Sequence, residues 1–140
     1  MMESVRRAGL DDLDRCRELL EAARREVPRG TDRLPAIDPE TWWLGDDRLL
    51  LVGLFAGAVV GLAAGQAEGG IGQVACCYVE PEAREVGVGG ELLAGLLSWF
   101  ADRGCTDVDA LALPGDRSTK QMLETAGFKA RLLVFHRPLP

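Results

Sequence analysis

The chain has 140 residues, of which 47% are hydrophobic and 27% are charged, and its formal net charge is −6. This length and composition predict one globular domain, residues 1–140, with a real hydrophobic core. The lack of a Lys/Arg cluster argues against a nucleic-acid partner. Four cysteines and a single histidine fit no zinc pattern, so we expect no metal and the reduced thiols of a cytoplasmic protein.

The N-terminal third predicts one strand and two helices. A short, charged strand spans Glu3–Ala8, and a helix capped by Asp11 or Asp12 then runs to about Val27 with its apolar residues on one face. A second helix begins at Asp38–Glu40, because an N-cap acid, a first-turn proline and a second acid follow one another there. Trp42 and Trp43 lie in this helix, and we expect them to anchor it to the core.

The segment Leu49–Gly65 contains no charge and carries glycine at every fourth position. A repeated Gly-x-x-x-Gly is typical of packed membrane helices, so a membrane span is the rival interpretation. A span needs about 20 apolar residues and positive flanks, and this segment is shorter and lacks such flanks. It divides instead into Leu49–Phe55, a turn at Ala56–Gly57 and Ala58–Ala67. This division predicts a β-hairpin buried on both faces and no membrane partner.

The centre of the chain predicts a strand, Gln73–Glu80, followed by a helix, Gly87–Arg103, which Gly104 ends. The turn between them, Arg84–Gly90, is rich in glycine. Glycines at the start of a helix leave the first backbone N–H groups uncovered, and the helix dipole adds positive charge there, so the turn predicts a phosphate site. Leu92 replaces the third glycine of the dinucleotide fingerprint, and no Gly-Lys-Ser/Thr follows, which excludes both common phosphate-loop motifs.

The C-terminal part predicts strand, helix and strand. The strand Asp107–Leu113 is reached by a crossover, so we expect it to run parallel to Gln73–Glu80. Asp116 caps a helix that continues through Ala126, and Phe128–Leu139 is expected to be a last strand. The order β-α-α-β-β-β-α-β-α-β predicts an α/β fold with a mixed sheet and helices on both faces.

The glycine-rich turn resembles a known family motif. Arg84-Glu85-Val86-Gly87-Val88-Gly89 follows Val79-Glu80-Pro81, and this arrangement resembles the acetyl-CoA motif of the GNAT superfamily of N-acetyltransferases. Gly57–Gly61 looks like the turn of that family's second hairpin, and Leu123–Phe128 looks like its Tyr-Glu-x-x-Gly-Phe with the tyrosine replaced. The resemblance implies the acyl-CoA N-acyltransferase fold, with a mostly antiparallel central sheet whose two parallel strands splay apart around acetyl-CoA.

The resemblance also implies a cofactor site. The pyrophosphate would bind the amides from Val86 to Gly90, while Arg84 and Glu85 shape the turn. Backbone groups of Cys77 and Val79 would pair with the pantetheine arm as an added strand, and a free N–H near them would polarise the thioester carbonyl. The implied cofactor-binding residues are Cys77, Val79, Arg84, Glu85, Val86, Gly87, Val88, Gly89, Gly90 and Asp116.

The implied catalytic groups are sparser. The positions where the family carries a base or an acid hold Gln73, Leu111 and Leu123, so proton transfer has no usual side chain. Tyr78 and Glu80 are the nearest ionisable candidates, and their plain interpretations are an outward strand residue and a solvated charge. The catalytic candidates are therefore the backbone amides of Cys77 and Val79, with Tyr78 in addition. We expect direct acetyl transfer to a primary amine of a small molecule or peptide; the alternative is an acyl-CoA-binding module with little or no turnover.

The last predicted strand also bears on assembly. Many relatives of this kind end with two strands, whereas one, Phe128–Leu139, remains here. An apolar edge strand is prone to association, so we expect a homodimer that uses this strand or adjacent helix faces. The alternative is a monomer in which this strand lies inside the sheet and Ser4–Arg7 forms the edge.

Overall fold

A computed structural model of the chain describes residues 5–27 and 33–140. Its sheet has five strands in the order β1-β2-β3-β4-β5. The strands are β1 Val5–Arg7, β2 Arg48–Phe55, β3 Ala58–Glu68, β4 Ile71–Val79 and β5 Asp107–Ala110. The first four pair antiparallel and β4 pairs with β5 in parallel, which confirms the predicted mixed, mostly antiparallel sheet.

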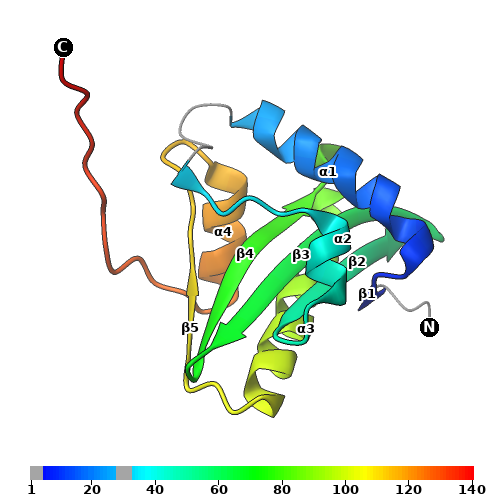
Figure 1. The fold of residues 1–140 in the computed structure, drawn as a ribbon. Helices are drawn as coiled ribbons and strands as arrows, with labels where there is room; N and C mark the ends of the chain where they lie inside the picture. The colour runs from blue at the N-terminus through cyan, green and yellow to red at the C-terminus, as the bar shows by residue number, and fades with distance from the viewer. Residues whose placement is uncertain (1–4, 28–32) are drawn as a thin grey trace.

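Helices cover both faces of this sheet (Figure 1). The helices are α1 Leu13–Glu26, α2 Pro39–Leu44, α3 Val88–Asp102 and α4 Arg117–Thr125, and the 3-10 turns η1 Leu10–Asp12 and η3 Pro81–Val86 precede α1 and α3. Leu50 and Val52 of β2 pack with α1 and α2, while Leu49 and Leu51 pack with α3. Since strand side chains alternate between faces, β2, which is apolar after Arg48, contributes to both halves of the core.

The glycines of the apolar segment have a packing role. On the face of the sheet that meets α3, a Cβ atom built on Gly53 would lie 2.4 Å from Val88 Cγ1, and one on Gly65 would lie 2.9 Å from Phe100 Cζ. A Cβ on Gly61 would lie 2.8 Å from a backbone oxygen. These residues and Gly72, which we call the glycine row, bring α3 close to the sheet. Gly53, Gly61 and Gly65 thus share one face of the sheet, as strand alternation allows, whereas Gly57 lies in the turn between β2 and β3. Among the described residues no helix has the length and apolarity that a membrane span requires.

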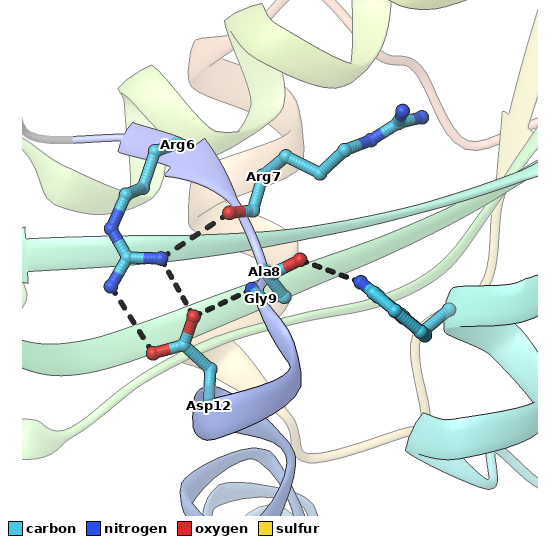
Figure 2. A network of polar contacts seen from close by, with 6 residues as sticks. Arg6, Arg7, Ala8, Gly9 and Asp12 are labelled. Atoms are coloured by element: carbon cyan, nitrogen blue, oxygen red, sulfur yellow. Dashed lines mark hydrogen bonds and ion pairs between the residues drawn. The ribbon is translucent and has the colours of Figure 1, made fainter.

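Trp42 anchors α2 to the core, as predicted, whereas Trp43 is 36% exposed and lies outside the core. The Trp42 indole N–H donates to the carbonyl of Leu49 at 3.1 Å, and the Trp43 indole N–H donates to the carbonyl of Ala8 at 2.8 Å. Figure 2 shows the second contact beside a cluster in which Asp12 binds the guanidinium of Arg6 and the backbone N–H of Gly9. The Asp12 carboxylate thus connects the end of β1 with the start of α1. The hydrogen bond from Arg6 lowers the pKa of Asp12.

Several expected boundaries and one expected strand differ from the structure. β1 spans Val5–Arg7, and residues 3 and 4 of the expected strand lie outside the described residues. β5 ends at Ala110 and does not reach Leu113, because beyond Ala110 the chain leaves its pairing with β4. The predicted last strand, Phe128–Leu139, is wrong. Phe128 packs against the core, but the chain then leaves the molecule as an extended tail with no partner strand to complete a ladder (Figure 1).

Candidate functional site

The parallel strands β4 and β5 separate half-way along β4. They pair only where Ile71–Val74 faces Asp107–Ala110, so Ala75–Val79 has no neighbour on that side. A cleft of about 380 Å³ occupies the space, and its lining includes Ala75–Val79, Leu111–Leu113 and residues of α1. The splayed pair implied by the sequence resemblance is therefore present.

A bulge in β4 sets the direction of its backbone groups beside the cleft. The register with β3 shifts between Ala64 and Gly65, so that Ala75 becomes an additional residue on β4. Beyond it, the N–H of Glu80 donates to Val60 of β3 at 2.9 Å. Because backbone groups of an antiparallel strand alternate in direction, Tyr78 also pairs with β3, whereas the N–H and C=O groups of Cys77 and Val79 face away from β3, toward the cleft.

The glycine-rich turn lies directly after the cleft. Gly87 has φ +85° and stands at the N-cap of α3, where a side chain would be strained. A Cβ on Gly90 would meet no atom within 4 Å, whereas one on Gly89 would lie 2.5 Å from Met122 Sδ of α4. Gly89 therefore packs α3 against α4, and Gly87 and Gly90 are the glycines that leave backbone N–H groups open.

Arg84 turns back from this region toward the cleft. Its Nε donates to the carbonyl of Val79 at 2.9 Å, and its Nη2 lies 2.5 Å from Oε2 of Glu26 at the end of α1. Its guanidinium carbon also lies 5.5 Å from the centre of the Tyr78 ring. The hydrogen bond that Arg84 donates to Glu26 raises the pKa of Arg84, so the guanidinium remains charged. Sequence reasoning missed Glu26, because nothing in the helical pattern of α1 marks its last residue as a partner of the turn.

The two ionisable candidates, Tyr78 at the end of β4 and Glu80 just after it, are neither an outward strand residue nor a solvated charge. Tyr78 points inward, beneath α1, with 8% of its surface exposed. Burial, with the Glu26 carboxylate in second place, raises the pKa of Tyr78, so its phenol is neutral at physiological pH. Glu80 is ion-paired with Arg15 of α1 at 2.5 Å. Tyr78 therefore lines the cleft as a neutral hydroxyl, and Glu80 fastens α1 to the end of β4.

The thiols beside the cleft are poor nucleophiles. Cys76 and Cys77 are both free, and they point to opposite faces of the sheet, as expected for neighbours on a strand. Burial raises the pKa of Cys76 to about 12 and that of Cys77 still further. The Cys77 thiol lies 3.6 Å from the sulfur of Met122. A thiolate, which is the reactive form, is therefore scarce at neutral pH.

The three positions where the family resemblance implies a base or an acid, Gln73, Leu111 and Leu123, lie in different parts of the structure. Leu123 lies in the core on α4, away from solvent, whereas Leu111 lines the cleft and Gln73 lies in a smaller hollow at the other end of β4. Asp116 lines the cleft and caps α4, since its carboxylate accepts from the N–H of Thr119 at 3.1 Å. Across residues 5–27 and 33–140, no group of three His, Cys, Asp or Glu side chains is placed to hold a metal.

The structure thus brings together part of the predicted site. Cys77, Tyr78, Val79, Arg84 and Asp116 line the cleft. The remaining residues follow Arg84 along the chain at the start of α3 and are not part of the lining; they are Glu85, Val86, Gly87, Val88, Gly89 and Gly90. We call Ala75–Val79 and Arg84, together with the adjoining turn that continues to Gly90 outside the lining, the strand wall. We call the lining residues within Arg17–Glu26 and Leu34–Pro39 the helix wall.

This geometry can be compared with known proteins. The sequence profile of the Acetyltransferase (GNAT) family matches residues 13–128. The chain belongs to the GNAT family. The matched region includes the splayed strands, both walls of the cleft and the glycine-rich turn, so the GNAT resemblance of the sequence is confirmed. No curated protein sequence matches the chain.

Solved structures of similar fold include aminoglycoside N-acetyltransferases. AAC(6')-Iy in complex with CoA aligns with a TM-score of 0.76 at 17% identity, over 97% of this chain and 99% of that one. The enzyme meta-AAC0020, from an uncultured soil metagenomic sample, aligns with a TM-score of 0.72 at 13% identity, over 97% and 95% of the two chains. The BH1408 protein from Bacillus halodurans gives 0.82 at 12% identity, over the whole of both. At these identities the likeness establishes the fold, and family membership supports acetyl transfer from an acyl-CoA as the general activity.

Proposed function

We propose that this GNAT protein transfers an acetyl group from acetyl-CoA to a primary amine of a small molecule or peptide. The single observation that carries the proposal is the strand wall, where the backbone groups of Cys77 and Val79 face a cleft that leads to the N-terminus of α3. An extended pantetheine arm has amides that such a strand edge can pair with, and a helix N-terminus with open N–H groups suits a pyrophosphate.

The reaction needs few side chains. A neutral amine attacks the thioester carbonyl carbon, the carbon–sulfur bond breaks, and the CoA thiolate leaves while the new ammonium group gives its proton to water. The N–H of Cys77 or Val79 stabilises the oxyanion that forms in the transition state. Positioning of two reactants supplies about 7–11 kcal/mol of a barrier, so catalysis does not require a strong base. The Tyr78 phenol is neutral and lines the cleft, so its hydroxyl can donate a hydrogen bond to the leaving thiolate, which takes its proton from water.

Cofactor binding can be tested by thermal unfolding with CoA. At 100 times its Kd, CoA should stabilise the wild-type fold by about 2.7 kcal/mol. Gly90→Val should remove this gain, because the new side chain enters the open space beside the first N–H groups of α3. Ser98→Val is the matched control, since it places the same branched residue on the exposed side of the same helix. A wild-type protein that millimolar CoA does not stabilise would contradict the proposal.

Turnover separates the enzyme from the alternative, an acyl-CoA-binding module. That alternative is favoured by the leucines at 111 and 123, where the family usually carries proton-transfer groups. We expect CoA thiol release with an amine panel that begins with aminoglycosides, because structural neighbours are aminoglycoside N-acetyltransferases. The rate should rise with pH as the acceptor amine loses its proton. Stabilisation by CoA without thiol release from any amine would favour the binding module.

We also propose a homodimer. The tail carries four apolar residues in succession that are between 69% and 89% exposed: Leu132, Leu133, Val134 and Phe135. A second copy of this chain is the occupant we infer for them, since closed two-fold symmetry is the commonest way to cover a shared patch. Light scattering should give twice the monomer mass, and Leu133→Lys should halve it. A wild-type protein of 15.1 kDa at micromolar concentration would contradict this inference.

A further inference from the structure

Two ion pairs connect α1 with the segment around Pro81. Arg15 binds Glu80 and Glu26 binds Arg84, and each pair has a shortest contact of 2.5 Å. The side chains are similarly exposed, at 33% and 32% in the first pair and 25% and 35% in the second. The pairs have opposite polarity, because α1 provides the cation in one and the anion in the other. Because the two pairs are alike in length and exposure, a variant that breaks one pair can serve as the control for a variant that breaks the other.

Only the second pair reaches the strand wall. The guanidinium of Arg84 binds the carbonyl of Val79 as well as Glu26, and it lies over the ring of Tyr78. The carbonyl of Val79 faces the cleft, where the proposed function places the pantetheine arm. The other pair also touches a backbone carbonyl, but that carbonyl belongs to Val59 of β3. In the free protein, then, Arg84 occupies a position that a strand-like ligand would use.

The turn itself lacks a further cation. Glu85 adds a negative charge next to the proposed pyrophosphate site, and Val86 beside it is uncharged. Within Pro81–Gly90 the only basic side chain is therefore Arg84. A guanidinium pairs with phosphate oxygens through two parallel hydrogen bonds, which makes it a stronger phosphate ligand than a neutral amide.

We propose that Glu26 is a positioning residue that sets the affinity for CoA by competing with the pyrophosphate for Arg84. In the free protein Glu26 holds Arg84 across the end of the strand wall. When CoA binds, Arg84 exchanges Glu26 for the pyrophosphate, and the carbonyl of Val79 becomes free to pair with the pantetheine arm. The inference rests on the proposed function, since it requires that CoA bind at this turn.

The competition fixes the direction of a mutational effect. Breaking the pair with Glu26 is part of the cost of binding, so removal of the carboxylate should tighten CoA binding. A merely structural Glu26 would act in the opposite direction, because loss of a contact between α1 and the turn would loosen the site. Partly exposed ion pairs contribute modestly, so we expect a two- to fivefold decrease in Kd, on the order of what such pairs are worth.

The test compares Glu26→Gln with Glu80→Gln by titration calorimetry of CoA. Both variants remove one negative charge from an α1 ion pair of the same length, so long-range electrostatic effects are matched. Glu26→Gln should lower the Kd two- to fivefold relative to Glu80→Gln. An equal or higher Kd in Glu26→Gln overturns the proposal. Failure of the wild-type protein to bind CoA would instead overturn the proposed function.

A double-mutant cycle shows whether Glu26 acts through Arg84. In an Arg84→Met background the guanidinium is absent, so Glu26→Gln should leave the Kd for CoA unchanged. Arg84→Met alone should raise the Kd, because the pyrophosphate loses its cation. If Glu26→Gln still lowers the Kd in the Arg84→Met background, Glu26 acts directly on CoA through its charge, and the exchange is wrong. Circular dichroism of each variant verifies that it is folded before its Kd is compared.

Discussion

The two walls of the cleft present different chemical groups, backbone amides and carbonyls on one side and charged side chains on the other. The strand wall presents backbone groups of Cys77 and Val79 and a helix start opened by glycine. The helix wall presents charged side chains of α1, of which Arg24 and Glu26 are examples. An added side chain that displaces the strand moves these backbone groups themselves, whereas a charged side chain can be replaced without altering the helix that bears it. We therefore expect the strand wall to be intolerant of substitution and the helix wall to determine the acceptor.

The largest effect should come from a side chain added behind the strand wall. A Cβ on Gly61 would lie 2.8 Å from the backbone oxygen of Tyr78, which the β3–β4 ladder holds in place. Overpacking of this kind costs about 3 kcal/mol at the upper end of its usual range, so Gly61→Val should lower the free energy of unfolding in urea by that amount. Glu21→Val, on the exposed surface of the helix wall, should change it by less than about 0.5 kcal/mol. Equal losses of unfolding free energy in Gly61→Val and Glu21→Val would contradict the expected difference between the two walls.

An intermediate effect is expected where the far side of the cleft meets α4. The Asp116 carboxylate caps α4 through the N–H of Thr119, so Asp116→Ala should lower the free energy of unfolding by about 1 kcal/mol. Asp116→Asn keeps an accepting oxygen and should lose much less. A loss in Asp116→Asn as large as that in Asp116→Ala would show that the charge, and not the cap, is what α4 requires.

The smallest effect on activity should come from the thiol of Cys76. Its pKa of about 12 leaves almost no thiolate at neutral pH, so Cys76→Ala should keep the rate of acetyl transfer within about twofold.

The raised pKa of the Cys76 thiol also makes the free energy of unfolding depend on pH. Because the folded-state pKa lies above the ordinary value of 9.0, the contribution is complete below pH 9 and is lost as the pH rises toward 12. Between pH 8 and 10 the wild type should lose up to about 1 kcal/mol more than Cys76→Ala.

Much of the strand wall could be predicted from the sequence, because its signals are local. The order of elements as far as α4, the hairpin at Ala56–Gly57, the parallel β5 and the cap at Asp116 follow from local patterns along the chain, and each of these predictions is confirmed; the strand expected after α4 is not. Glycine spacing likewise located the turn before α3. That Gly89 packs against α4 could not be predicted, since it depends on where Met122 lies after folding.

The helix wall could not be predicted in the same way. The contacts of Glu26 and Arg15 join residues 58 and 65 positions apart, and no sequence period reports such a pairing. The inward position of Tyr78 was missed for a related reason. In a strand buried on both faces, alternation does not show which side chains lie beneath which helix, so an inward Tyr78 cannot be told from an outward one. For the C-terminal tail, the sequence predicted a strand that does not form. An apolar run forms a strand only where a neighbouring strand is present to pair with it.

The glycine row has a consequence for how this protein tolerates change over generations. Since Gly53 meets Val88 and Gly65 meets Leu96 and Phe100, a larger residue in the row shifts α3 outward and carries the first N–H groups of that helix away from the end of β4. A stabilising substitution elsewhere would restore the stability of the fold, but it would not restore the distance between the first N–H groups of α3 and the end of β4. Genetic suppressors of a Gly53→Ala lesion should therefore be size exchanges directly across the contact, such as Val88→Ala, and general stabilisers should rescue protein abundance without rescuing acetyl transfer.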